Sequence, residues 1–408
     1  MRYLRAFLAA CVVFAACNHA EEPVGPQVVT DDGLIVTSGG ESAFRIVYAS
    51  AKTNAEGFAA FLSDRCGVKV PLVLDSAEPT DYEILIGECG RPECAEVAKD
   101  FAGAFGYSAR VVGTRLVITG SDVTWTSFGL RAVVKELREE CLDGQDLFVP
   151  KNFAVKQVTD NPQMIARLIR QKYDFTLNPV QVLNCPPDGD IYVAQGAAGD
   201  DNYIYISLRS ADDTKARVYK YGIKSKDLIA KSAVFNAGHC NDMTFDSARD
   251  QVIVAHGHNE GRILTPLDAA TLEVKPNITI PVGSGAITYN ASRASYAISQ
   301  GGSTFYVADS DFKVTLNGKR TDSTGYTAQG MGSDDSYVYF PMSGSKDNIL
   351  VVYDWEGKFV TTLTVPLTIE SESMFYAAGR YYVAFYAGSK VGASLYEIIP
   401  VHYYSYSK

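Results

Sequence analysis

The stretch Asn236-Ala-Gly-His-Cys-Asn-Asp-Met-Thr-Phe-Asp246 places a histidine, an amide and a carboxylate directly before a short strand-like run. The same arrangement, with altered chemistry, recurs through the second half of the chain. If Asn241 is taken as the index position, its counterparts are Gln195, Gly285, Gln329 and Glu372. The index positions lie about 44 residues apart, a period that is typical of a propeller or a solenoid.

Each repeat contains short alternating runs separated by polar turns, with no long helical pattern. Four such runs per unit are typical of a propeller blade, whereas a β-helix has much shorter coils. The sequence therefore predicts a five-bladed β-propeller over residues 180–408. The fifth repeat lacks an outer strand. Val180–Leu183 would supply it and lock the ring, and Tyr403–Tyr406 is the alternative.

Polar side chains of the repeats are expected to gather at one mouth of the predicted channel. Residues two apart in a strand share a face, so the index positions form one ring and the positions two earlier form another. The second ring contains His239 and Glu370, and Asp242 adds a further carboxylate. The predicted ligand-binding residues are Gln195, His239, Asn241, Asp242, Gln329, Glu370 and Glu372.

Three interpretations of this mouth stay open. The polar residues form a structural network with trapped water, or they bind a ligand, or they catalyse a reaction. His239, Glu370 and Glu372 are the candidate catalytic residues, because glycoside hydrolysis uses two carboxylates and a lyase can use histidine as its base. On one face of one strand, the two glutamates would lie roughly 7 Å apart.

Metal binding has weaker support. His239, Asp242 and Glu372 offer mixed nitrogen and oxygen ligands, and His256 and His258 have strand spacing. Gly257 between the two histidines indicates an exposed turn instead. No metal site and no cofactor is therefore predicted.

The N-terminus has the pattern of a targeting segment. Arg2 and Arg5 precede an apolar run that is too short to span a membrane. The run ends Phe14-Ala-Ala-Cys17, which resembles the lipobox of bacterial lipoproteins, although phenylalanine replaces the usual leucine. The resemblance implies a signal peptide over residues 1–16, lipidation of Cys17, a membrane anchor, and a tether over residues 17–32. A plain secretory signal is the alternative.

Residues 33–158 alternate between strand and helix patterns and predict a small α/β layered domain. The expected helices are Asn54–Arg65, Glu93–Phe105 and Trp125–Leu137, and the expected strands are Phe44–Ala49, Tyr82–Ile86, Tyr107–Val112, Arg115–Thr119 and Leu147–Val149. Residues 159–179 are expected to form a linker that contains a helix over Ile165–Lys172.

The segment Tyr82-Glu-Ile-Leu-Ile-Gly-Glu-Cys-Gly-Arg-Pro-Glu93, followed by Arg115–Gly120 and a helix, resembles the N-terminal accessory domain of β-hexosaminidases and α-glucuronidases. Cys89 stands where that family has threonine. The family's domain is not catalytic, and the barrel that should follow it is missing from this chain. The resemblance thus implies only a carbohydrate-processing context. We expect Arg91 to form a buried structural salt bridge rather than a ligand contact.

Composition excludes one class of partner. The net charge is −10 and no basic stripe exists to neutralise phosphates, so no nucleic acid partner is expected. The six cysteines beyond Cys17 predict one or two disulfides, with the first domain as the favoured place, because an exported chain permits such bonds. In a strictly anaerobic source they would stay free thiols. The sequence has no nucleophile elbow, phosphate loop or zinc-protease motif.

The predicted fold class is a two-domain α+β chain, with a small α/β layered domain followed by an all-β five-bladed propeller. The repeats resemble propellers of bacterial surface proteins, including helveticin-like bacteriocins. The favoured function is an exported, membrane-anchored lipoprotein of the cell surface that binds an extracellular ligand, with a glycan favoured. The alternatives are a glycoside hydrolase or polysaccharide lyase that uses the His/Glu cluster, and a protein-interaction scaffold.

Overall fold

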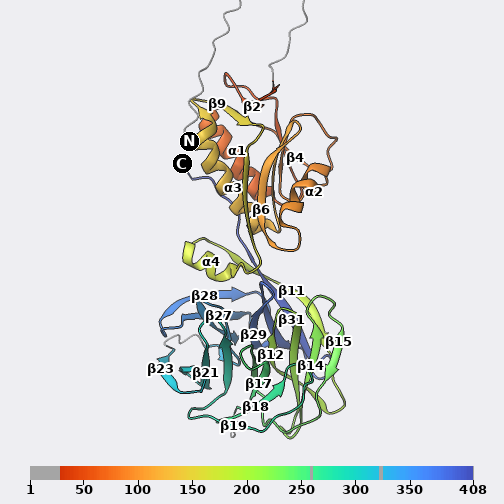
Figure 1. Cartoon of the computed structure of the whole chain (residues 1–408), viewed down its shortest axis with the longest axis vertical. Coiled ribbons are helices and arrows are strands. Elements are labelled where there is room, and N and C mark those ends of the chain that lie inside the picture. The colour runs from red at the N-terminus through yellow and green to blue at the C-terminus, as the bar shows by residue number, and fades with distance from the viewer. Residues whose placement is uncertain (1–27, 258–260, 321–324, 408) are drawn as a thin grey trace, which may run out of the picture.

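The computed structural model describes residues 28–257, 261–320 and 325–407. The predicted signal peptide, Cys17, the first part of the tether and His258 lie outside the described residues. The chain is mostly β, in many small sheets, and its two halves are stacked along the long axis of the molecule (Figure 1). Among the described residues, no helix has the length and apolar character needed to cross a membrane.

A six-stranded sheet in the order β10-β6-β7-β5-β3-β4 forms the centre of the first half. Its strands are β3 (Arg45–Tyr48), β4 (Leu72–Leu74), β5 (Glu83–Ile86), β6 (Phe105–Val112), β7 (Arg115–Gly120) and β10 (Ala154–Thr159). A second, smaller sheet joins β1 (Val29–Thr30), β2 (Gly33–Thr37), β8 (Leu142–Asp143) and β9 (Asp146–Pro150).

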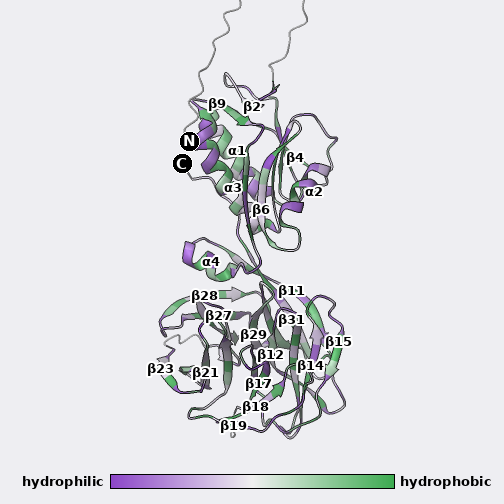
Figure 2. Cartoon of the chain, viewed as in Figure 1, coloured by the Kyte–Doolittle hydropathy of each residue, from purple (hydrophilic) through white to green (hydrophobic). Residues whose placement is uncertain are grey.

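Helices cover both faces of the six-stranded sheet. Alternation within the strands separates the two faces: Ile84 and Ile86 pack with α1 and α3, whereas Leu85 packs with α2. The bounds are α1 (Lys52–Cys66), α2 (Pro92–Ala98) with a 3-10 turn (Lys99–Phe101), and α3 (Val123–Glu136) with a π turn (Leu137–Cys141). Both α1 and α3 carry hydrophilic and hydrophobic residues along their length (Figure 2).

The expected helices of this half are all present. The second is shorter than expected, because α2 ends at Ala98, its 3-10 continuation ends at Phe101, and Phe105 begins β6 instead. The prediction for Arg91 is confirmed. Its guanidinium bonds the fully buried Glu83 at 3.2 Å, together with the carbonyl oxygens of Asp75 and Ala77. Arg91 therefore stabilises the strand edge and is not free to hold a ligand.

The expectation of disulfides is wrong for this structure, in which all six cysteines of the described part are free thiols. Cys66, Cys185 and Cys240 lie in three different apolar clusters. Buried cysteine behaves there as a small hydrophobic residue. The even number of cysteines was therefore no guide to pairing.

The second half consists of five successive small sheets. The first sheet contains β12 (Ile191–Gly199), β13 (Tyr203–Ser210), β14 (Ala216–Gly222) and β15 (Leu228–Lys231), and the second contains β16 (Asp242–Asp246), β17 (Gln251–Ala255), β18 (Ile263–Asp268) and β19 (Ile278–Thr279). The third contains β20 (Ala286–Asn290), β21 (Ser295–Gly301), β22 (Thr304–Asp309) and β23 (Val314–Lys319), and the fourth contains β24 (Thr327–Ala328), β25 (Gly332–Ser333), β26 (Tyr337–Ser343), β27 (Asn348–Asp354) and β28 (Phe359–Val365). The fifth contains β29 (Glu370–Ala377), β30 (Arg380–Tyr386) and β31 (Ala393–Val401), together with β11 (Thr176–Cys185).

The last sheet takes its outer strand from the beginning of the repeat region. Strand β11 pairs antiparallel with β31, and Val180 lies opposite Glu397. This pairing confirms the expected role of Val180–Leu183, in a strand that starts four residues earlier, at Thr176. The alternative strand, Tyr403–Tyr406, is not formed.

Instead, residues 402–406 run back to the first half as a C-terminal strap. The Tyr404 ring lies in the apolar core beside α1, and its backbone N–H donates to Asn54 at 2.6 Å. His402 donates its backbone N–H to Thr124 at 2.9 Å, and the Tyr406 hydroxyl bonds Asp64 at 2.8 Å. Together with α4 (Met164–Gln171), the strap ties the two halves together (Figure 1).

Candidate functional site

The first strands of the five sheets meet around one axis. Strand β12 contacts β16, β16 contacts β20, β20 contacts β25, β25 contacts β29, and β29 contacts β12 again. The residues one after each index position face this axis, and four of them are small. The five residues are Gly196, Asp242, Ala286, Gly330 and Ser373, and all except Asp242 are small. The small residues leave room for a single larger side chain, the carboxyl group of Asp242.

Glycine is required at two of these positions by close approach of the neighbouring strand. A Cβ atom on Gly330 would lie 2.2 Å from the Glu372 carbonyl oxygen, and one on Gly196 would lie 2.7 Å from the Met243 nitrogen. Both obstacles are backbone atoms, which cannot move aside as a side chain does. The glycines therefore set how tightly the inner strands converge.

Asp242 links four of the five sheets from this position. Its Oδ2 atom accepts hydrogen bonds from the backbone N–H groups of Ile287 at 3.0 Å and Met331 at 2.9 Å. Its Oδ1 atom lies 2.5 Å from the hydroxyl group of Ser373 in the fifth sheet. That hydroxyl group lies 3.1 Å from the carbonyl oxygen of Ala197 in the first sheet. The side chain is completely buried, so it is a structural centre rather than a surface ligand contact.

The geometry favours a protonated Asp242. A serine hydroxyl has one hydrogen to donate and can also accept. If Asp242 carries a proton on Oδ1, it donates to Ser373, and Ser373 in turn donates to the carbonyl oxygen of Ala197. An ionised Asp242 would compete with Ala197 for that one hydrogen. In agreement, burial raises the pKa of Asp242 to about 8.

Three index residues lie at irregular points in the strand ladders. Glu372 is an extra residue between Ser371, opposite Phe385, and Ser373, opposite Ala384. Gln195 lies in the register shift between Ala194 and Ala197. Gln329 begins a segment of three residues, Gln329–Met331, that lies opposite two residues of the partner strand, Phe340 and Pro341. Such β-bulges redirect side chains and are common beside functional sites.

The bulge at Glu372 corrects the expected arrangement of the two glutamates. Simple alternation put Glu370 and Glu372 on one face, but one extra residue between paired positions breaks the period of two, so alternation no longer fixes their relative direction. Glu370 is exposed and accepts a hydrogen bond from Gln329 Nε2 at 2.6 Å. Glu372 is only 3% exposed.

Glu372 is the unusual group at this end of the channel. No described residue donates a hydrogen bond to its carboxyl group. The two carboxyl oxygens are not completely buried, because they are absent from the set of fully buried side-chain atoms without a partner. Burial, and then repulsion from Glu370, raise the pKa of Glu372 well above its ordinary value, although Arg209 opposes the shift. Burial therefore favours the neutral form of the Glu372 carboxyl group.

The neighbouring cation, Arg209, is a functional candidate that the sequence interpretation missed. Arg209 on β13 is 9% exposed, forms an ion pair with Asp213 at 2.7 Å and lies 3.3 Å from His239 Nε2. His239 Nδ1 lies 3.2 Å from the other oxygen of Asp213. The index positions lie on the first strand of each repeat, whereas Arg209 lies on a second strand, opposite Val193. The expected pairing of these two strands was the feature that could have identified Arg209.

A cavity of about 630 Å³ opens beside these residues, between the second, third and fourth sheets. Its wall includes Asn241, Arg262, Gln300 and Gln329. Asn241 donates to the carbonyl oxygens of Gly285 and, at 2.9 Å, of Gln329. The third repeat has glycine at both ring positions, and the Gln300 side chain lies over Gly283, so amide groups dominate this wall.

The structure thus places the seven predicted ligand residues in four positions. Gln329, Glu370 and Asn241 are joined at the rim, and His239 contacts Arg209 behind it. Gln195 and Glu372 are nearly buried at the bulges, and Asp242 lies at the axis below them. Across the described ranges, no group of three or more His, Cys, Asp or Glu residues could hold a metal ion. His256 is buried against Thr265.

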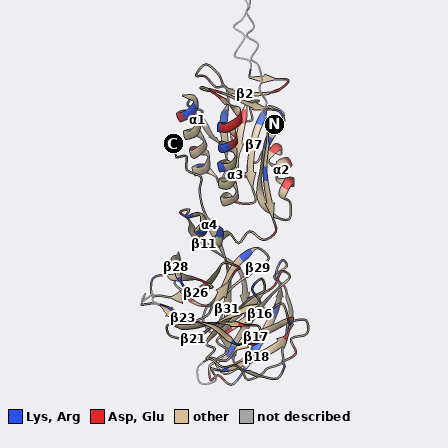
Figure 3. Ribbon diagram, turned by 60° about the vertical axis from the view of Figure 1, so that its left-hand side comes forward, with Lys and Arg blue, Asp and Glu red and all other residues tan. Residues whose placement is uncertain are grey.

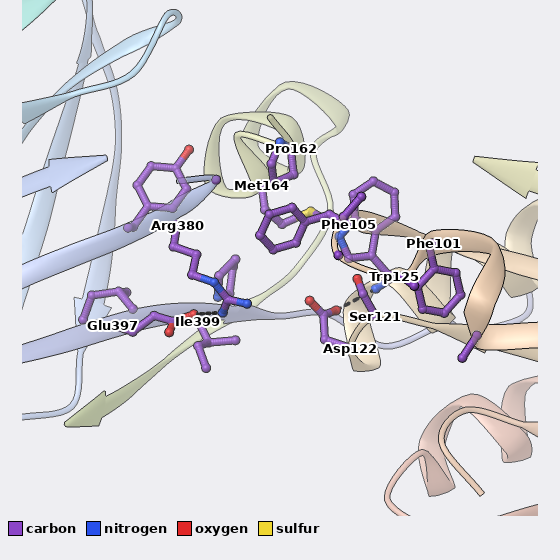
Figure 4. Close-up of a pocket in the computed structure, with 18 residues that line it drawn as sticks. Phe101, Phe105, Ser121, Asp122, Trp125, Pro162, Met164, Arg380, Glu397 and Ile399 are labelled. Atoms are coloured by element: carbon purple, nitrogen blue, oxygen red, sulfur yellow. Dashed lines mark hydrogen bonds and ion pairs between the residues drawn. The ribbon is translucent and has the colours of Figure 1, made fainter. Parts of the chain in front are cut away.

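Two further cavities lie elsewhere. One of about 430 Å³ is at the opposite end of the inner strands, beside Asn161 and Gln163. Another, of about 480 Å³, lies where the two halves meet (Figure 4). Its polar groups already have partners, since Arg380 pairs with Glu397 and Asp122 caps α3 through the Trp125 N–H at 2.9 Å. Acidic and basic side chains are interspersed over both halves (Figure 3).

Comparisons with known proteins found similarity to solved structures at low sequence identity. No family model and no curated protein matches it. Among solved structures, it is similar to the glutaminyl cyclase of Myxococcus xanthus, with 10% identity and a TM-score of 0.40 over 56% of this chain and 98% of that one. It is also similar to the hydrazine synthase of Kuenenia stuttgartiensis, with 12% identity and a TM-score of 0.32 over 50% and 58%. A Bacteroides fragilis protein described as exported aligns at 7% identity and a TM-score of 0.33 over 55% and 95%. Likeness at this level carries no argument about function.

Proposed function

We propose that the second half is a closed five-bladed β-propeller and that its channel mouth binds an extracellular glycan, on a lipoprotein held at the cell surface through Cys17. The cyclic contacts of the five first strands and the pairing of β11 with β31 support closure. The resemblance of the first domain to a glycosidase accessory domain supports a carbohydrate context.

The observation that carries the ligand proposal is the cavity beside Asn241 and Gln329. Its size lies within the range of small-molecule sites. Side-chain amides supply both donors and acceptors, which is what the hydroxyl groups of a sugar require. The carboxylate of Glu370 fixes the Gln329 amide from one side, so that amide is held in place before a ligand arrives.

Binding to a panel of immobilised glycans tests the proposal, with Gln329→Ala as the site variant. Gln181→Ala is the matched control, because Gln181 is exposed on the outer strand β11, away from the mouth. We expect Gln329→Ala to lower affinity at least about tenfold and the control to bind normally. Equal binding by all three proteins, or no binding by the unmodified chain, would contradict it.

Hydrolysis of a glycan is the second candidate, and it rests on the different environments of Glu370 and Glu372. A buried carboxyl group with a raised pKa beside an exposed carboxylate is the combination that acid–base cleavage of a glycosidic bond uses. Product release from the same panel, abolished in Glu372→Gln, would favour this candidate over simple binding. Intact glycans after prolonged incubation would exclude hydrolysis of those substrates.

A further inference from the structure

We propose that the ligand of the channel mouth carries a protonated amine, held by the carboxyl groups of Glu370 and Glu372. This inference rests on the proposed function and deepens it, because it names an amino sugar rather than a neutral glycan. It starts from the one buried carboxyl group at the mouth that lacks a hydrogen-bond donor among the described residues, that of Glu372.

Both glutamates lack a cationic partner at the mouth. Neither forms an ion pair with a described residue, and the interaction between them is repulsive. Arg209 is the nearest cation, but Asp213 already neutralises it at 2.7 Å. The groups that face Glu372 from the surrounding elements are Glu370, Arg209, Asp242 and Tyr386, with His239 and Asp213 behind Arg209. The exposed Glu370 therefore leaves a negative charge at this point that no described cation offsets.

A protonated amine matches this arrangement in both charge and hydrogen bonding. It has donors for both carboxyl groups and no acceptor, so it satisfies Glu372 and removes the repulsion between the two glutamates. When the amine enters, Glu372 releases its proton to solvent and forms a charge-assisted hydrogen bond. An acetamide in the same place would bring no charge to offset the two carboxylates.

The experiment compares two probes of equal length by calorimetry on the full chain at pH 7.5. One is the tetramer of β-1,4-linked glucosamine and the other is its fully N-acetylated form. We expect the amine tetramer to bind at least about tenfold more tightly. We also expect its binding to release protons, seen as a dependence of the heat on the buffer.

Substitutions then assign the effect to the two glutamates. Glu370→Gln and Glu372→Gln should each lower affinity for the amine tetramer about tenfold and remove the preference over the acetylated form. Glu88→Gln, on the exposed surface of the first half, is the control and should change nothing. Because Glu370 is exposed, its variant should fold even if the buried Glu372→Gln does not.

The outcomes separate this inference from the function it rests on. If the acetylated tetramer binds as well as the amine form, or the glutamine variants keep the preference, the amine inference is wrong while glycan binding stands. If neither tetramer binds, the amine inference is also wrong, and the glycan panel with Gln329→Ala decides the proposed function separately.

Discussion

Removal of the Asp242 carboxyl group should destabilise the second half of the chain strongly. Asp242→Ala leaves the buried N–H groups of Ile287 and Met331 without an acceptor. An unsatisfied buried donor costs about 1–3 kcal/mol, so the two together predict a loss of about 4 kcal/mol. The free-energy cost at Ser373 is smaller, because its hydroxyl group still donates to the carbonyl oxygen of Ala197 at 3.1 Å. A total stability of about 5–15 kcal/mol would be cut substantially.

Asp242→Asn is the informative comparison, since the amide oxygen can accept from the same two N–H groups while its nitrogen donates to Ser373. We expect it to cost about 1 kcal/mol or less. It should also remove a pH dependence. The folded pKa of Asp242, about 8, lies above its unfolded value near 3.8. The protonated group therefore stabilises the fold at low pH, and that contribution is lost as the pH rises from about 4 to about 8.

Urea unfolding at pH 7 measures these free energies, and hydrogen exchange by mass spectrometry reports the Ile287 and Met331 amides directly. Asp227→Ala is the control, because Asp227 is exposed in a turn and its loss should stay within about 0.5 kcal/mol. If Asp242→Ala lost less than about 1 kcal/mol and left the exchange of both amides unchanged, the structural role of this carboxyl group would be refuted.

Three further predictions concern the close approach at the axis and the C-terminal strap. Gly330→Ala should lower the thermal midpoint by several degrees through its contact with the Glu372 carbonyl oxygen, whereas Gly90→Ala, whose nearest neighbour is 3.6 Å away, should leave it within about a degree. Tyr404→Ala should cost about 3–5 kcal/mol in urea unfolding because it empties a core position, while the adjacent, exposed Tyr403→Ala should cost little; equal losses would contradict the strap. His402 should make stability fall as the pH drops below about 6.5, because burial lowers the folded pKa and only the unfolded chain then takes up the proton. Urea titrations between pH 5 and 7 should be run in Asp242→Asn, in which Asp242 no longer titrates. We expect this slope there, and we expect it to disappear when His402→Gln is added.

The physical basis of the last prediction is the position of the His402 ring. Its Nδ1 atom lies 2.7 Å from the carbonyl oxygen of Asp174, which requires a proton on Nδ1. Its Nε2 atom lies 3.2 Å from Arg131, which donates to it. The ring also stacks on Tyr173, with centroids 4.8 Å apart. A second proton on Nε2 would face the guanidinium group, so the strap is built for a neutral histidine.

Local patterns in the sequence were sufficient for much of the secondary structure. In the second repeat, the apolar run Val252–Ala255 forms all of β17 except its first residue, and in the fourth, Ile349–Asp354 forms all of β27 except its first residue. The period between index positions located the first strand of each sheet. These features depend on side-chain alternation and turn chemistry, which are properties of neighbouring residues. The outer strand β11 was also predicted from the sequence, because the fifth repeat has one strand fewer than the other repeats and needs a strand from elsewhere.

Tertiary structure alone decided what the index residues do. The bulges at Gln195, Gln329 and Glu372 depend on pairing with a partner strand, so alternation within one strand could not reveal them. Nothing in the sequence marks Asp242 as buried and Glu370 as exposed, because both stand beside polar residues in equivalent repeats. The strap returned to the first half because Tyr404 fills a core position there, a contact between residues more than 300 apart. The sequence therefore determined the repeats and their strands, while convergence of the five first strands on one axis decided that the carboxyl group of Asp242 is buried and that of Glu370 is exposed.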